Sequence, residues 1–176
     1  DVWEKFYGKR NAVNLAIGSD ETQHVLWRLD HGNIDGISPK LAVVMIGTNN
    51  SGKGQPPECI AEGLKAIIER LRAKLPKTRI LLLGIFPRGA DNKDHFRQIN
   101  YKVNKIISNL ADGKTVFYLD IGSKFLAADG TLTEEVMPYL LHLSAKSFQT
   151  WAEAIEPTVA KLMAMDPPPS TSAKAQ

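Results

Sequence analysis

Four short apolar runs, separated by helical patterns, constrain the fold of this chain more than any other feature. Runs that are apolar throughout are typical of strands buried on both faces, which belong to parallel sheets. Between them, apolar residues recur at the three- and four-residue spacing of one helix face, clearest at Ile99, Val103, Ile106, Ile107 and Leu110. We therefore predict an α/β protein of three layers, α/β/α, with right-handed crossovers. The predicted strands are Ala12 to Ile17, Leu41 to Ile46, Arg79 to Ile85 and Thr115 to Leu119.

The length and composition are those of one domain with a tail. The chain has 176 residues, of which 43% are hydrophobic, enough for a single substantial core. We expect the domain to span residues 1–165. Residues 166–176 are rich in Pro, Ser and Ala and are predicted to be disordered.

Several classes of protein are disfavoured by composition. The longest apolar run, Ile80 to Phe86, is far shorter than the roughly 20 residues of a membrane span. Cys59 is the only cysteine, which argues against an internal disulfide and a structural zinc site. The net charge of +3 comes from scattered residues without a long basic run, so we do not expect nucleic acid as a partner.

Polar residues follow the predicted strands, where ligands bind in sheets of this kind. Asn49 follows the second run and carries an amide donor that could stabilise an oxyanion, although an Asn in a turn has the same signature. His142 lies between Pro138 and Ser144 among leucines. It is a candidate general base, and the alternative is a packed histidine without a catalytic role.

A phosphate-binding loop is an alternative, because Gly47 to Lys53 follows a strand and matches that pattern through its lysine. Asp120, after the fourth run, would then be a second metal-binding acid. The next position should be Ser or Thr to hold magnesium, and here it is Gly54. Gln55 and two prolines follow where a helix should begin, so nucleotide binding is disfavoured.

Together, several blocks resemble the SGNH/GDSL hydrolases, and most of all their platelet-activating-factor acetylhydrolase branch. The resemblance extends in order over residues 1–160. Its blocks are Asn14 to Asp20, His24 to Leu29, Gly47 to Asn50, Leu83 to Gly89, Asn100 to Asn104, Asp129-Gly130 and Leu141 to Ser144.

This resemblance implies a flavodoxin-like parallel sheet of which the chain holds strands two to five. The first, central strand would lie between Ala12 to Ile17 and Leu41 to Ile46. It also implies an esterase that cleaves small acyl esters, such as acetyl groups on a lipid or carbohydrate, through an acyl-enzyme, without metal or organic cofactor. The expected partner is a small-molecule ester, and a homodimer is the assembly we consider.

The resemblance assigns roles to three residues. It implies that the Asn49 side chain and the Ser19 backbone N–H form the oxyanion hole and that His142 is the general base. Ser19 stands where this branch usually has glycine, and Tyr139 stands where the family has the acid that supports the histidine. Asp129, Glu134 and Glu135 are the alternative acids.

The Gly-Asp-Ser block that carries the family's nucleophile would precede the region matching Asp1 to Tyr7. Ser51, Ser123 and Ser144 lack the local sequence of a nucleophile turn. Three hypotheses follow: a fragment of a serine esterase without its nucleophile, a degenerate SGNH-like binding subunit, and the nucleotide-binding protein described above.

Overall fold

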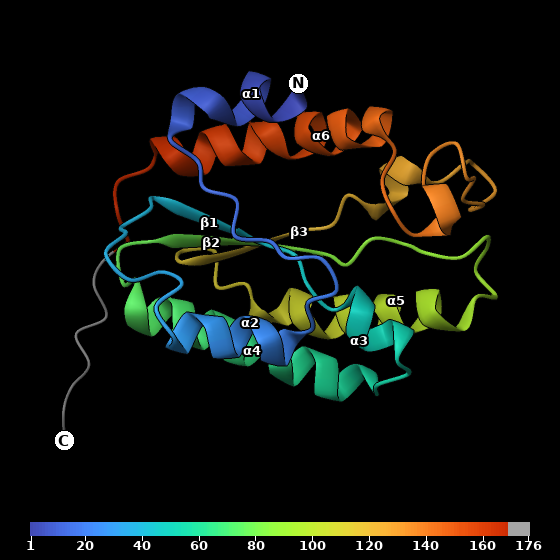
Figure 1. The fold of residues 1–176 in the computed structure, drawn as a ribbon, viewed down its shortest axis with the longest axis horizontal. Helices are drawn as coiled ribbons and strands as arrows, with labels where there is room; N and C mark the ends of the chain where they lie inside the picture. Colours follow the sequence, from blue (N-terminus) through green and yellow to red (C-terminus); the bar gives the residue numbers. More distant parts are fainter. Residues whose placement is uncertain (169–176) are drawn as a thin grey trace.

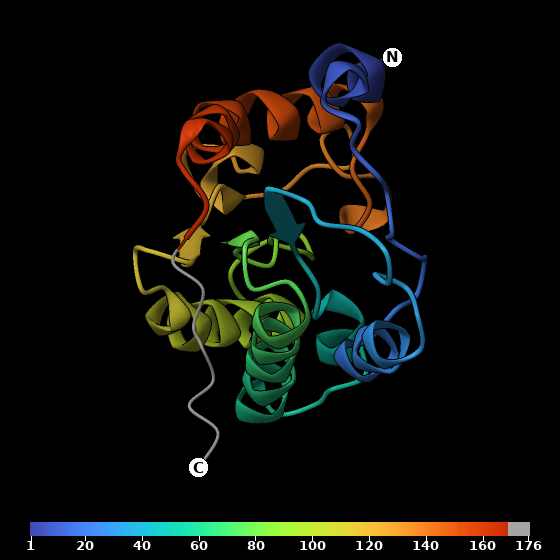
Figure 2. The ribbon, with the colours of Figure 1, turned by 90° about the vertical axis from the view of Figure 1, so that its left-hand side faces the viewer.

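The structure is a computed structural model that describes residues 1–168. A parallel three-stranded sheet in the order β1-β2-β3 forms the middle layer. Figures 1 and 2 show α1 and α6 on one side of this sheet and the other α-helices on the opposite side. The predicted α/β/α architecture is therefore confirmed. The main elements are α1 (Val2–Tyr7), α2 (Thr22–Asp30), β1 (Leu41–Val44), α3 (Thr48–Gly52), α4 (Pro57–Lys74), β2 (Arg79–Leu83), α5 (His95–Ile107), β3 (Val116–Leu119) and α6 (Ala145–Ala164).

The central strand β2 divides the core into two halves. All five of its residues are buried, as expected for a strand covered on both faces. Because side chains alternate along a strand, Ile80 and Leu82 pack with α4 and α5, whereas Leu81 and Leu83 pack with α6. The sheet thus joins two apolar clusters into one domain.

The helices begin where the sequence supplies capping groups. The Asp94 side chain accepts the Arg97 N–H at 2.8 Å and starts α5, and the Ser144 hydroxyl accepts the Ser147 N–H at 3.3 Å and starts α6. In α4, Pro57 stands at a first-turn position that needs no N–H donor. Short 3₁₀ turns complete the fold: η1 (Gly8–Arg10), η2 (Ser108–Leu110), η3 (Gly122–Phe125) and η4 (Pro138–Leu140).

The predicted strand from Ala12 to Ile17 is not formed. This segment has no ladder hydrogen bonds in the described chain, and the side chains of Val13 and Ile17 are 66% and 58% exposed. Figure 2 shows it running from the α1 layer to the α2 layer beyond β1. A strand requires a neighbour for its backbone groups. Within residues 1–168, no strand lies between this segment and β1, in agreement with a fold that lacks its central strand.

Residues 169–176 of the predicted disordered tail lie outside the described residues. Before them, the Arg79 guanidinium donates hydrogen bonds to the backbone carbonyls of Met165 and Asp166. The start of β2 is thereby tied to the end of α6.

Two further findings concern the described residues. None of their helices is long and apolar enough to cross a membrane. They contain no group of three or more His, Cys, Asp or Glu side chains arranged to hold a metal ion.

Within residues 1–168, β1 has a partner strand on one edge only, and its other, free edge generates the first prediction. Because this apolar edge carries unpaired backbone groups, we expect the chain to self-associate. Val43, which is 43% exposed, lies in this strand. Val43→Lys should reduce self-association, because a charge on an edge strand opposes strand pairing. Sedimentation velocity over a concentration series measures this.

Ile106→Lys is the matched control, since Ile106 is also exposed but lies on α5. Equal self-association of Val43→Lys and the unchanged chain would contradict the prediction. So would a monomeric chain with a cooperative thermal transition above about 60 °C, near the upper end for ordinary domains.

Candidate active site

Asn49 reaches the candidate site because the backbone turns sharply after β1. Gly47 has φ +124°, and a Cβ there would lie 2.7 Å from the Ile85 Cδ1 atom, so the turn requires glycine. The turn starts α3, whose second residue is Asn49. The Asn49 Nδ2 donates to the Asp20 carbonyl oxygen at 2.8 Å. The structure thus brings Asn49 beside the Ser19-Asp20 segment.

Ser19 adopts the left-handed conformation, with φ +67°. Glycine adopts this region more easily than serine does, because it has no Cβ. The neighbouring Asp20 carboxylate pairs with Arg28 of α2, and Arg28 also donates to the Leu15 carbonyl at 2.8 Å. These contacts hold the segment. In the described chain, the Ser19 N–H has no acceptor.

Asn50 is a site residue to which the sequence analysis gave no role. Its side chain is fully buried, and its Oδ1 accepts the Thr22 N–H at 3.1 Å, while Nδ2 donates to Thr22, Gln23 and Gln55. Asn50 therefore fixes the start of α2 against α3. Its position beside Asn49 was the only signal in the sequence.

His142 lies on an exposed loop and is not brought into hydrogen-bond contact with Asn49. In residues 1–168, no side chain hydrogen-bonds its ring, and its backbone N–H donates to the Pro138 carbonyl at 3.1 Å. Tyr139 is 84% exposed. Tyr139 and Leu140 both have left-handed backbones, at φ +56° and +52°, which cost about 1–2 kcal/mol each for such residues.

The alternative acids do not support His142 in this structure. The Asp129 carboxylate accepts the N–H and hydroxyl of Thr131 at 2.9 and 2.7 Å, and these bonds lower the pKa of Asp129. Within the described part of the chain, neither Glu134 nor Glu135 forms a hydrogen bond or ion pair with His142.

The phosphate-loop alternative does not fit the structure. Residues 48–52 form α3, and the N–H groups of Ser51, Lys53 and Gly54 donate to backbone carbonyls within this turn. A phosphate site needs such N–H groups free. The Lys53 ammonium instead pairs with the buried Glu21 carboxylate at 2.5 Å.

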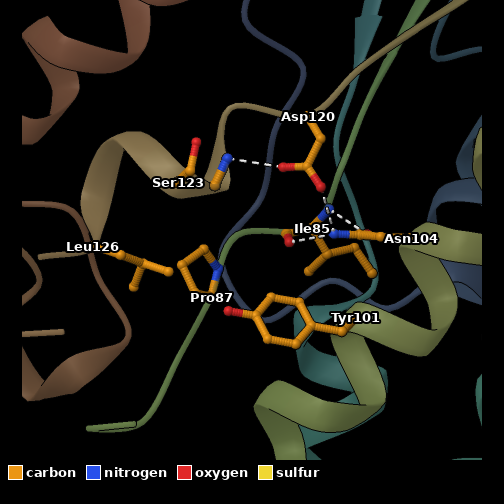
Figure 3. Close-up of a pocket in the computed structure, with 8 residues that line it drawn as sticks. Ile85, Pro87, Tyr101, Asn104, Asp120, Ser123 and Leu126 are labelled. Atoms are coloured by element: carbon orange, nitrogen blue, oxygen red, sulfur yellow. Dashed lines mark hydrogen bonds between the residues drawn. The ribbon is translucent and has the colours of Figure 1, made fainter. Parts of the chain in front are cut away.

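Asp120 belongs to a different hollow, shown in Figure 3, with a volume of about 310 Å³. Its Oδ1 accepts the Gly122 N–H at 2.8 Å, and the Tyr118 hydroxyl lies 3.4 Å from Oδ2. Burial, followed by the charge of Asp120, raises the pKa of Tyr118. None of Ser19, Asn49 and His142 is among the residues that line the hollow: Ile85, Pro87, Tyr101, Asn104, Asp120, Gly122, Ser123 and Leu126.

Comparison with known proteins decides the family. A sequence model of the GDSL-like lipase/acylhydrolase family matches residues 1–149. The chain belongs to this family. Platelet-activating factor acetylhydrolase IB subunit alpha1 of Homo sapiens is 35% identical over 167 residues, covering 94% of this chain and 71% of the relative. The alpha2 subunit of Gallus gallus is 33% identical over 168 residues, covering 95% and 72%. The predicted resemblance is confirmed.

Solved structures agree on the fold of this GDSL-family chain. An acetylxylan esterase from Geobacillus stearothermophilus superposes with a TM-score of 0.71 at 13% identity, covering 94% of this chain and 78% of that one. A GDSL-like lipase from Bacteroides thetaiotaomicron gives a TM-score of 0.71 at 14% identity, covering 91% and 80%. At these identities the likeness concerns the fold alone.

The Glu21–Lys53 pair generates a prediction about stability and pH. The hydrogen bond from Lys53 lowers the pKa of Glu21, so the pair stabilises the fold when Glu21 is ionised. Lys53→Met should therefore destabilise the protein at pH 7. An ordinary glutamate has a pKa of about 4.3, and that of Glu21 in the folded protein is lower. As the pH falls through this range, the difference in unfolding free energy between Lys53→Met and the unchanged chain should vanish. Urea unfolding at pH 7 and pH 3 measures this.

Lys65→Met is the matched control, because Lys65 forms an exposed pair with Glu69 at 3.8 Å on α4. It should change stability little at either pH. A loss for Lys53→Met that is the same at pH 7 and pH 3 would contradict the role of Glu21 ionisation.

Proposed function

We propose that this chain carries the oxyanion hole and the general base of a serine-dependent ester hydrolase that cleaves small acyl esters. Membership of the GDSL-like lipase/acylhydrolase family supports the reaction class. The observation that carries the proposal is the Asn49 side chain beside Ser19. An amide nitrogen has two hydrogens, and Asn49 gives one to the Asp20 carbonyl, so the other remains for a substrate oxygen.

In the proposed mechanism, a serine hydroxyl attacks the ester carbonyl, whose oxygen becomes negatively charged. The second Asn49 hydrogen and the Ser19 N–H stabilise this oxyanion by hydrogen bonding. The His142 imidazole accepts the serine proton and then donates it to the leaving alcohol. Water, deprotonated by the same imidazole, releases the acyl group and regenerates the serine.

The serine nucleophile is proposed to lie on a strand paired with the free edge of β1. The serines near the site serve local structure. The Ser51 hydroxyl donates to the Thr48 carbonyl at 2.9 Å, the Ser147 hydroxyl donates to the Val136 carbonyl at 2.6 Å, and Ser144 caps α6. A strand beside β1 would end at the same edge of the sheet as Gly47 and Asn49.

Acetyl esters are the proposed substrate class. Two relatives are named as acetylhydrolase subunits, and a structural neighbour as an acetylxylan esterase. These names describe those proteins, and the acetyl group is what they share. For this chain they support a small acyl group and leave the alcohol part of the ester open.

The first test of this proposal compares hydrolysis by three proteins. The unchanged chain should hydrolyse p-nitrophenyl acetate no faster than its His142→Ala variant, because no serine within residues 1–168 contacts His142. Fusion of a strand ending in Gly-Asp-Ser before Asp1 should create activity. In that fusion, Asn49→Ala should reduce kcat about 10²–10³-fold, the effect of losing one oxyanion donor.

A folded fusion without activity would favour the non-catalytic binding subunit instead. Activity of the chain as written that depends on His142 would show that another residue attacks, and would refute the proposed place of the nucleophile.

Tyr139 generates the second test. In the active fusion, Tyr139→Asp should raise kcat with little change in KM, because a carboxylate stabilises the imidazolium that forms during reaction. The gain is bounded by about 10⁴-fold, the loss on removing such an acid. Tyr139→Asn is the matched control, since it tolerates the same left-handed backbone without the charge. Equal kcat for both variants would contradict the proposal that a carboxylate is missing here.

A further inference from the structure

Arg97 is a buried cation whose charge is not met by a carboxylate. Its side chain is fully buried in the first turn of α5. Within residues 1–168 its guanidinium donates only to backbone carbonyls: Nε to Arg88 at 2.7 Å, Nη1 to Gly130 at 2.8 Å, and Nη2 to Gly89. A helix N-terminus disfavours a cation, and burying a charge is costly. The guanidinium therefore depends on these three carbonyls to offset the cost of its burial.

The first of these acceptors leads to the Asn49 side of the candidate site. The Arg88 side chain turns toward α3, where its Nη1 donates to the Thr48 carbonyl at 2.8 Å. Its guanidinium also lies 5.1 Å from the centre of the Phe96 ring. Gly52 leaves room for it, because a Cβ there would lie 2.9 Å from Nη1. Thr48 directly precedes Asn49, so the Arg88 side chain links its own backbone to the turn that carries Asn49.

The second acceptor leads to the His142 side. The Gly89 N–H donates to the Leu140 carbonyl at 2.9 Å, two residues before His142. The third acceptor, Gly130, lies in the turn whose Leu132 N–H donates to the Ala90 carbonyl at 2.8 Å. The backbone of residues 88–90 therefore connects the Asn49 turn with the His142 loop. Arg97 fixes this backbone through its hydrogen bonds to the Arg88 and Gly89 carbonyls.

We infer that Arg97 is a positioning residue that couples the Asn49 turn to the His142 loop. This role rests on the proposed function, because only an oxyanion donor and a general base of one active site need Asn49 and His142 to keep a fixed relative position. The rigid, planar guanidinium suits three acceptors in different directions, whereas a lysine ammonium on a flexible stem does not reproduce that fork. The sequence carries a signal for it: Arg97, Asn100 and Asn104 recur at helical spacing on a buried face.

The experiment uses the labelled chain and follows backbone amide NMR signals, so no hydrolysis is needed. Arg88→Met releases the Thr48 carbonyl at one end of the link. We expect it to shift the signals of Leu140, Leu141 and His142 at the other end. Arg79→Met is the control, because Arg79 is another arginine whose guanidinium donates to backbone carbonyls, those of Met165 and Asp166. Shifts no larger than those in the control would overturn the inference.

A double-mutant cycle tests Arg97 itself. In an Arg97→Met background, Arg88→Met should no longer shift the His142-loop signals, and Arg97→Lys should fail to restore the effect although it keeps the charge. Full transmission in either background would overturn the inference. If Arg97→Met does not fold, the same comparison in the Arg97→Lys background decides alone. If Arg88→Met shifts the His142-loop signals but the fusion does not hydrolyse esters, the proposed function is refuted and the coupling stands. If the fusion hydrolyses esters but the signals do not shift, the coupling is refuted and the proposed function stands.

Discussion

The pairing of β2 with strands on both of its edges is the interaction on which the rest of the structure depends. β2 pairs with β1 over Arg79 to Leu82 and with β3 over Ile80 to Leu83, and the side chains of Ile80 to Leu83 enter both apolar clusters. Parallel pairing brings the carboxyl ends of all three strands to one edge. The Asn49 turn, the Arg88 segment and the Asp120 turn are neighbours for this reason.

Glycines and buried polar side chains then shape that edge into a candidate site. Gly47 permits the turn that carries Asn49, and Asn50 fixes this turn against α2. Arg97 holds the backbone that separates Asn49 from the His142 loop. The membership of the GDSL-like lipase/acylhydrolase family gives these contacts a chemical context, because acyl transfer needs an oxyanion donor and a base in a common frame.

The sequence predicted some parts of the molecule well. Strands β1, β2 and β3 were found because a buried strand is apolar whatever its neighbours are. The segment from Ala12 to Ile17 has the same apolar character and yet forms no strand. Its hydrogen-bond partners would come from another strand, which no local pattern reports.

By itself, the sequence determined the layered α/β fold, the family and the candidates Ser19, Asn49 and His142, because periodicity and motif order are properties of the chain. Only the tertiary structure decided that Asn49 meets the Asp20 carbonyl, that Lys53 is paired with Glu21, and that no carboxylate within residues 1–168 contacts His142. It also revealed the place of Arg97 between two loops. Hydrogen bonds between residues distant in the chain depend on how the layers pack, and that packing is set by all the residues together.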